Sequence, residues 1–334
     1  MLGLALVVTR AYTNISKMNE SNCMIRIGTR SSPLALVQAA LVRTALQAVH
    51  PNKRIEIIPF TTRGDQTLGS LHDIGGKALF TKELQDALLS NKIDIAVHSL
   101  KDVETHDMPL LLCAYLPREV AHDVLITKKD IKTNHLTGTL GSCSPRRCAQ
   151  AAIVWPDVAL VDLRGNVGTR LKHVLDGTID ATILAAAGLK RLGLLGDSFN
   201  DTYFALKQTP LSFETFIPAA GQGVIALECR MGEGALFRPI NDVKTEQCAL
   251  VERLLSRHLG GNCRIALGVH ARHVDEDSYD LDVMAFFEGH TIQRVLKLDE
   301  LAKQDADYKE FFMKKDLVAY LEEAVYEMAE ELKN

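Results

Sequence analysis

The strongest constraint on the fold is a regular alternation of short apolar runs and longer amphipathic stretches that begins at residue 24. Apolar runs of strand length stand at 24–29 (MIRIGT), 55–62 (IEIIPFTT) and 94–99 (DIAVHS), and helical periodicity appears at 33–49 and 80–90. The first helix has a clear start, since Ser32 can cap it and Pro33 suits its first turn. The order strand-helix-strand-helix-strand predicts an α/β unit with a mostly parallel sheet.

The same pattern restarts after residue 122. Ser144 and Pro145 repeat the helix-start signal of Ser32 and Pro33, so a second helix with the same kind of cap is predicted there. Further strands are predicted at 123–127, 158–163 and 180–185, and a further helix at 166–177. A second α/β unit of similar size is the simplest interpretation.

The last third of the chain has a different order of elements. A glycine-containing segment at 217–229 ends in a predicted buried strand, and a long helix follows at 242–259. Residues 281–289 and 290–298 are typical of an antiparallel pair, and 315–333 of an amphipathic helix. This third part is therefore expected to be α+β, and 334 residues suffice for three domains.

Charge and cysteine usage exclude several classes of protein. The net charge of −4 argues against a protein that coats nucleic acid or an anionic membrane. Seven scattered cysteines without a CxxC or a zinc-finger spacing indicate thiols in a reducing compartment and no metal site. Residues 1–23 lack the basic start of a secretory signal, so we interpret them as an extension upstream of a true start at Met24, with a transit peptide as the alternative.

Arginines gather where predicted strands give way to helices. Arg30 precedes the first helix, Arg146 and Arg147 stand in the first turn of the second, and Arg164 and Arg170 flank the glycines of LRGNVGTR. Cations oppose the dipole at a helix N-terminus, unless a bound anion reverses the effect. Arginine pairs bidentately with carboxylates, so the pattern predicts a ligand with several carboxylates.

The segment HSLKDV (98–103) stands at the end of a predicted strand, where α/β proteins place catalytic residues. Asp102 is a candidate acid or base, and the alternative is a structural cap or an ion pair with Lys101. The glycine loop GGKALF (75–80) lacks the spacing of a phosphate-binding loop, so no nucleotide is predicted.

Nine longer motifs occur together and in one order: IGTRSSPLALVQA, TRGD, GGKALFTKEL, DIAVHSLKDV, SPRR, LRGNVGTRL, AAAGLKRLG, PAAGQGVIALECR and LGGNCRIALG. From about residue 24 to its C-terminus, the chain resembles the porphobilinogen deaminases. The resemblance implies a transferase that joins four porphobilinogen molecules head to tail, with loss of ammonia, and releases hydroxymethylbilane for haem biosynthesis. It also implies a dipyrromethane primer, made from the same substrate and bound to one cysteine by a thioether.

Site residues follow from the matching motifs. Cys263 resembles the attachment point of the primer, and Asp102 the catalytic carboxylate. The resemblance implies that further residues bind the primer: Lys101, Ser144, Arg146, Arg147, Arg170 and Gln222. It implies that others contact the substrate: Arg30, Ser32, Asp65, Lys77, Phe80, Ser99, Arg164, Arg170 and Arg191.

The resemblance also implies a domain architecture. It implies two α/β domains similar to the halves of periplasmic binding proteins, joined by a hinge, and a smaller α+β domain that carries the cysteine. The expected limits are 24–118 with 224–241 for domain 1, 119–223 for domain 2 and 242–334 for domain 3. A cytoplasmic monomer, with no nucleic-acid or membrane partner, is expected.

Several positions depart from the family's usual motifs. Asn262 precedes Cys263, Ala266 replaces a proline, Cys143 and Pro145 replace commoner residues, and Glu104 stands in place of proline. None of these changes removes a charged or nucleophilic group. A solute-binding protein for organic anions is the main alternative, and it would explain the arginines but neither Cys263 nor the LysAspVal motif. A nucleic-acid-binding module is a third possibility, against which the acidic net charge counts.

Overall fold

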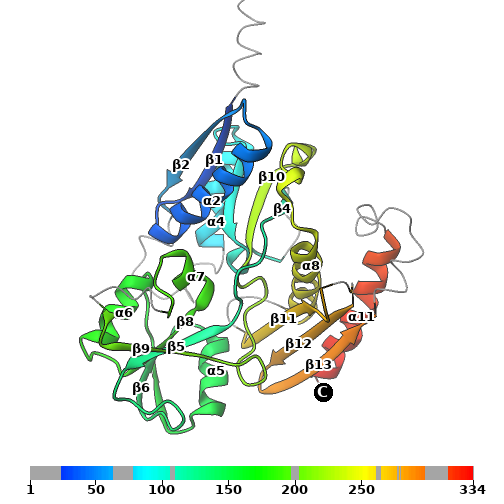
Figure 1. Ribbon diagram of the computed structural model, residues 1–334. Helices are drawn as coiled ribbons and strands as arrows, with labels where there is room; N and C mark the ends of the chain where they lie inside the picture. The colour runs from blue at the N-terminus through cyan, green and yellow to red at the C-terminus, as the bar shows by residue number, and fades with distance from the viewer. Residues whose placement is uncertain are drawn as a thin grey trace, which may run out of the picture.

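The computed structural model describes residues 24–62, 78–105, 110–196, 203–260, 265–276, 278, 280–297 and 315–333. These residues form two α/β lobes and a third, smaller unit with an antiparallel sheet (Figure 1). The expected fold class, two α/β domains followed by an α+β domain, is confirmed. No helix in the described part of the chain is both long and apolar enough to cross a membrane.

The first lobe is built on a five-stranded sheet in the order β2-β1-β3-β10-β4. Its elements are β1 (Met24–Arg30), α2 (Pro33–Val49), β2 (Arg54–Phe60), α4 (Ala78–Leu89), β3 (Ile95–Ser99), β4 (Leu110–Tyr115) and β10 (Ile225–Arg230). Helix α2 begins as predicted, because Ser32 Oγ accepts a hydrogen bond from Ala35 N at 3.3 Å. Its buried residues include Ala35, Ala39, Val42 and Leu46, and this spacing gives one apolar face toward the sheet.

The second lobe repeats this plan with the sheet order β7-β6-β8-β5-β9. Its elements are β5 (Asp123–Lys128), β6 (Gly138–Gly141), α5 (Pro145–Val154), β7 (Val158–Val161), α6 (Val167–Leu175), β8 (Ala181–Ala185), α7 (Ala186–Arg191) and β9 (Leu206–Pro210). In both sheets the fourth strand runs antiparallel to its neighbours: β10 in the first and β5 in the second. Each of these reversed strands enters its sheet from the other lobe.

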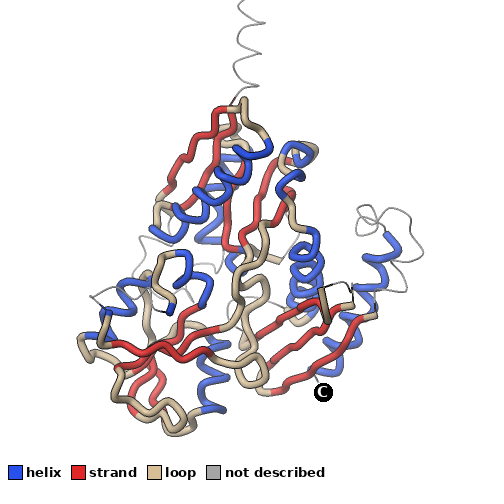
Figure 2. The backbone as a smooth tube through the Cα atoms, in the orientation of Figure 1, coloured by secondary structure: helices blue, strands red, loops and turns tan. Residues whose placement is uncertain are grey.

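Two crossing segments, residues 116–122 and 211–224, connect the lobes and appear as adjacent loops in Figure 2. They are joined by a backbone hydrogen bond from Glu119 N to Gly223 O at 3.2 Å. Gly223 has a φ of +88°, and a Cβ there would lie 2.3 Å from the Glu119 carbonyl oxygen. A side chain at position 223 would therefore push the two crossing segments apart.

The third unit packs α8 (Val243–His258) and α11 (Lys315–Lys333) against a sheet of β11 (Leu267–His273), β12 (Leu281–Phe287) and β13 (His290–Leu296). The predicted antiparallel pair is β12 and β13, with Phe287 opposite His290 at the turn. Asp242 caps α8 by accepting a hydrogen bond from Thr245 N at 2.7 Å. Figure 1 shows α8 close to β4 and β10 of the first lobe, so the third unit lies against the crossing region.

Among the strands and α-helices of the described residues, five had not been predicted from the sequence: β4, β6, β9, β11 and the short helix α7. Strand β6 reads GTLG and β9 reads LKQTP, so neither shows the apolar run or alternation that predicts a strand. Each is held instead by strands from other parts of the chain, β6 by β7 and β8, and β9 by β5. The sheets are mostly parallel as predicted, except for the reversed strand in each.

Candidate active site

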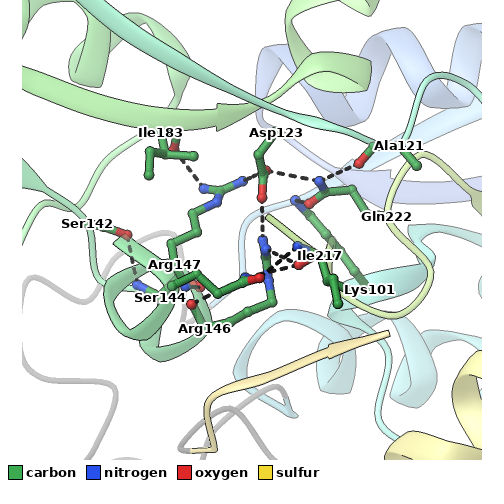
Figure 3. A network of polar contacts seen from close by, with 11 residues as sticks. Lys101, Ala121, Asp123, Ser142, Ser144, Arg146, Arg147, Ile183, Ile217 and Gln222 are labelled. Carbon is green, nitrogen blue, oxygen red and sulfur yellow. Dashed lines mark hydrogen bonds and ion pairs between the residues drawn. The ribbon is translucent and has the colours of Figure 1, made fainter. Parts of the chain in front are cut away.

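The Asp123 carboxylate joins two buried guanidinium groups of the second lobe (Figure 3). Arg146 Nη2 donates to Asp123 Oδ2 at 2.8 Å, and Arg147 Nη2 donates to Oδ1 at 2.7 Å. All three side chains are buried. Burial acts to raise the pKa of Asp123, but the two guanidinium groups hold it far below its usual range. Asp123 is therefore ionised and balances one of the two positive charges.

The remaining bonds of the two arginines go to backbone carbonyls. Arg146 Nη1 donates to Ile217 O at 2.7 Å, and Arg147 Nη1 donates to Ile183 O at 2.8 Å. Ser144 Oγ caps α5 by accepting from Arg147 N at 3.5 Å, which sets the helix start next to the cluster. Arg147 Nε is buried and has no hydrogen-bond partner among the residues described. One donor of this pair thus lacks the acceptor that a buried N–H needs.

Gln222 connects this cluster to the first lobe. Its Nε2 donates to Asp123 Oδ1 at 3.0 Å and to Ala121 O at 2.7 Å. Its Oε1 accepts from Lys101 Nζ at 3.4 Å. One amide on the second crossing segment therefore contacts both halves of the site, as Figure 3 shows.

Lys101 and Asp102 occupy a short 3-10 turn, Leu100–Asp102, directly after β3. Leu100 is buried and its N donates to Val224 O at 3.0 Å. Gly221 makes room for it, since a Cβ there would lie 2.7 Å from Leu100 Cγ and the φ of Gly221 is +74°. The turn thus rests on the second crossing segment while both charged side chains remain half-buried.

The electrostatics of the turn are dominated by positive charge. Burial lowers the pKa of Lys101 to about 8, and Arg147 acts in the same direction while Asp102 opposes it. Arg170 on α6 lies within hydrogen-bond reach of Cys143 and donates from Nε to Gly165 O at 2.8 Å. Burial lowers the pKa of Arg170, and the Asp102 carboxylate acts against that shift. Lys101, Asp102 and Arg170 therefore share one electrostatic environment.

The donor set fits a ligand with several carboxylates. Four cationic side chains, those of Lys101, Arg146, Arg147 and Arg170, gather around two carboxylates, those of Asp102 and Asp123. The excess of positive charge and the unpartnered Arg147 Nε both favour an anion. No cluster of metal-ligating side chains occurs in the described ranges.

Other predicted site residues have partners of their own in the fold. Arg164 Nε donates to Asp162 Oδ2 at 3.2 Å, and Arg191 Nη2 donates to Gly223 O at 2.6 Å. Ser99 Oγ and the buried Gln38 side chain are hydrogen-bonded at 2.8 and 3.1 Å. Arg30 is half-buried at the end of β1, before the Ser32 cap.

Four predicted residues cannot be compared at the level of side chains. Asp65, Lys77 and Cys263 lie outside the described residues. Phe80 lies on α4. Their roles remain predictions from the sequence.

Sequence reasoning missed Asp123, the centre of the network. A charged residue at the start of an apolar strand, DVLIT, is a signal that could have found it, because a buried carboxylate needs a partner. Gln38, which fixes Ser99, was missed too; its polar side chain falls on the buried face of α2.

Comparisons with known proteins show which family this chain resembles. Residues 25–237 match the family model "Porphobilinogen deaminase, dipyromethane cofactor binding domain". The porphobilinogen deaminase of Rickettsia typhi is 40% identical over 267 residues, which cover 78% of this chain and 87% of the relative. That of Thiobacillus denitrificans is 42% identical over 258 residues, covering 75% and 81%.

Solved structures show weaker similarity. The periplasmic VFT2 domain of BvgS from Bordetella pertussis aligns with a TM-score of 0.41 at 16% identity, covering 68% of this chain and 90% of that one. The aliphatic sulphonate binding protein SsuA from Escherichia coli aligns with a TM-score of 0.40 at 12% identity, covering 70% of each chain. The assignment rests on the family model and the curated relatives: this chain belongs to the porphobilinogen deaminase family.

Proposed function

We propose that this chain is active as a hydroxymethylbilane synthase. It condenses four porphobilinogen molecules head to tail, releases one ammonia in each condensation, and hydrolyses the finished hydroxymethylbilane from the enzyme. Growth takes place on a dipyrromethane primer that is bound to Cys263 through a thioether. Membership of the family supports this proposal, and so do the similar proteins that are named porphobilinogen deaminase.

One observation carries the proposal: cationic side chains from both lobes gather around the Asp102 turn. Lys101 comes from the first lobe, and Arg146, Arg147 and Arg170 come from the second. Porphobilinogen and every pyrrole made from it carry two carboxylates, an acetate and a propionate. A site of this charge suits a chain of such units better than a single small anion.

Arg147, Arg170 and Lys101 are the residues that would hold the carboxylates of the primer. When bound, the dipyrromethane supplies the free terminal pyrrole carbon to which the first unit is joined, and each later unit is joined to the unit before it. The Asp123 network keeps Arg146 and Arg147 in place before any ligand arrives, so little reorganisation is needed on binding. Arg30 and Ser32, at the start of α2, are proposed to contact the incoming substrate.

Asp102 is the proposed catalytic carboxylate. Loss of ammonia leaves positive charge on the substrate pyrrole, and a nearby carboxylate stabilises that charge and can hold its N–H proton. At a separation of about 4 Å and an effective dielectric near 20, such a pair contributes about 4 kcal/mol. Lys101 and Arg170 lie close enough to Asp102 for its carboxylate to act on the pKa of each of them.

The test is turnover by the purified full-length chain. With porphobilinogen as the sole substrate, we expect consumption of four molecules and release of four ammonia molecules for each hydroxymethylbilane formed. Binding of porphobilinogen without release of ammonia would favour the alternative, a solute-binding protein for organic anions. We further propose that the enzyme works as a cytoplasmic monomer, which light scattering of the purified protein and fractionation of its source cells would test.

A further inference from the structure

Helix α8 of the third unit contacts the backbone just beyond Asp102. Arg253 Nη2 donates to Glu104 O at 2.6 Å, and Nη1 lies 3.5 Å from Val103 O. Val103 is buried, and its N donates to Leu100 O at 3.0 Å, which closes the turn that carries Lys101 and Asp102. The Arg253 guanidinium group therefore fixes the backbone directly after the turn that carries Asp102.

The hydrogen bonds of Arg253 go to the main chain. No carboxylate in the described parts of the chain accepts a hydrogen bond from Arg253; the bonds found go to main-chain oxygens. Burial lowers the pKa of Arg253, and the nearby Tyr115 and Glu228 act against that shift. A charge that bonds only to two successive carbonyls fixes the path of the backbone between them, which an apolar contact would not do.

The preceding residue, Glu252, fastens the same helix to the crossing segments. It is fully buried and accepts hydrogen bonds from Arg118 Nη1 at 2.6 Å, Gly221 N at 2.6 Å and Ala271 N at 2.8 Å. Arg118 belongs to the first crossing segment and Gly221 to the second. Two successive residues of α8, Glu252 and Arg253, thus contact both crossing segments and the backbone that follows the turn after β3.

Arg253 lies in the C-terminal half of α8, which ends at His258. From Arg253 to the last helical residue, His258, the axis advances by about 8 Å. We propose that Arg253 is a positioning residue, through which α8 sets the place of Asp102. This inference rests on the proposed function, because it assigns Arg253 to the reaction in which Asp102 takes part.

The test compares kcat and KM in Arg253→Met, which keeps an unbranched apolar stem and removes the guanidinium group. A displaced Asp102 should lower kcat by about tenfold to a hundredfold, because shifts near 1 Å at the reacting centre have effects of this size. KM should stay within about twofold of the wild-type value. Arg253→Lys restores one donor and should recover part of the lost kcat.

A double variant separates positioning from general damage to the fold. Because Arg253 acts through Asp102, Asp102→Asn combined with Arg253→Met should be no slower than Asp102→Asn alone. A full additional loss in the double variant would show that Arg253 acts elsewhere and would overturn the inference. Arg257→Met, on the exposed last turn of α8, is the matched control and should keep the wild-type kcat.

A wrong catalytic assignment of Asp102 and a wrong inference about Arg253 would give different kinetic results. If Asp102→Asn alone turned over at the wild-type rate, the catalytic assignment and this inference would fall together. If Asp102→Asn were slow while Arg253→Met matched the wild type, the inference alone would be wrong. Primer attachment, read from the intact mass of each variant, should be complete in Arg253→Met.

Discussion

The two lobes share one topology and one type of helix start, yet the arginines next to these helix starts are buried to different extents. Ser32 and Ser144 both cap a helix whose first residue is proline. In the second lobe the two arginines after the cap are buried against Asp123, whereas in the first lobe Arg30 is half-buried at the end of β1. The cap signal therefore predicts where a helix begins and says little about the charge next to it.

The difference comes from the reversed strands. Strand β5 enters the second lobe with Asp123 as its first residue, next to the start of α5. Strand β10 enters the first lobe with Ile225, and its buried Glu228 pairs with His98 Nε2 at 3.1 Å. We interpret the second lobe as a preformed anion receptor and the first lobe as the holder of the Lys101–Asp102 turn.

The largest effect is expected on the stability of the second lobe. Asp123→Asn leaves two buried guanidinium groups with no carboxylate partner, and it should lower the free energy of unfolding by about 3–5 kcal/mol at neutral pH. The pKa of Asp123 is lowered on folding, so its contribution is present above the unfolded value of 3.8 and is lost as the pH falls through the folded value. Urea denaturation at several pH values measures both quantities.

Glu228→Gln is the matched change in the first lobe. Its partner, His98, can be neutral, so less uncompensated charge remains and the loss of stability should be smaller. Equal losses in the two variants would contradict the asymmetry between the lobes.

Catalysis should depend mainly on the first lobe. Asp102→Asn keeps the size of the side chain and should lower kcat by at least about a hundredfold, since the stabilisation of developing positive charge is lost. The melting temperature should change little, because this side chain is half-buried. Steady-state consumption of porphobilinogen gives kcat, and near wild-type turnover would make Asp102 a structural residue.

Binding of the substrate carboxylates tests one arginine of the second lobe, Arg170, and one of the first lobe, Arg30. Arg170→Gln and Arg30→Gln each remove one charged donor, so KM for porphobilinogen should rise by about tenfold in at least one of them. Because each added pyrrole brings two carboxylates, stalled chains of a particular length should accumulate, and mass spectrometry of the enzyme resolves them. Unchanged KM and no stalled chains in both variants would refute the carboxylate-binding assignment.

The smallest effect concerns pH. The pKa of Lys101 is about 8 in the fold, so its positive charge is present below pH 8 and is lost as the pH rises through that value. KM for porphobilinogen should therefore rise above about pH 8. Lys101→Arg keeps its charge and should shift this rise to higher pH; an identical profile in both enzymes would assign the rise to another group.

The sequence predicted local features better than long-range ones. The caps at Ser32 and Ser144 and the place of Asp102 at the end of a strand depend on neighbouring residues, and they could be predicted. The position of Asp123 between Arg146 and Arg147 depends on a strand that enters from the other lobe, so no local pattern revealed it. Arg191, whose role in substrate binding stays a prediction, donates to the Gly223 carbonyl, and no local pattern revealed this long-range contact.

The most direct test of the central claim is peptide mapping of protein purified from cells that make porphobilinogen. We expect the mass of a dipyrromethane on the peptide that contains Cys263 and on no other cysteine peptide. The Cys263→Ala variant should be folded, without primer and inactive. A dipyrromethane found on Cys143 or Cys148, which lie beside the arginines of the second lobe, or an unmodified Cys263 in active enzyme, would contradict the account.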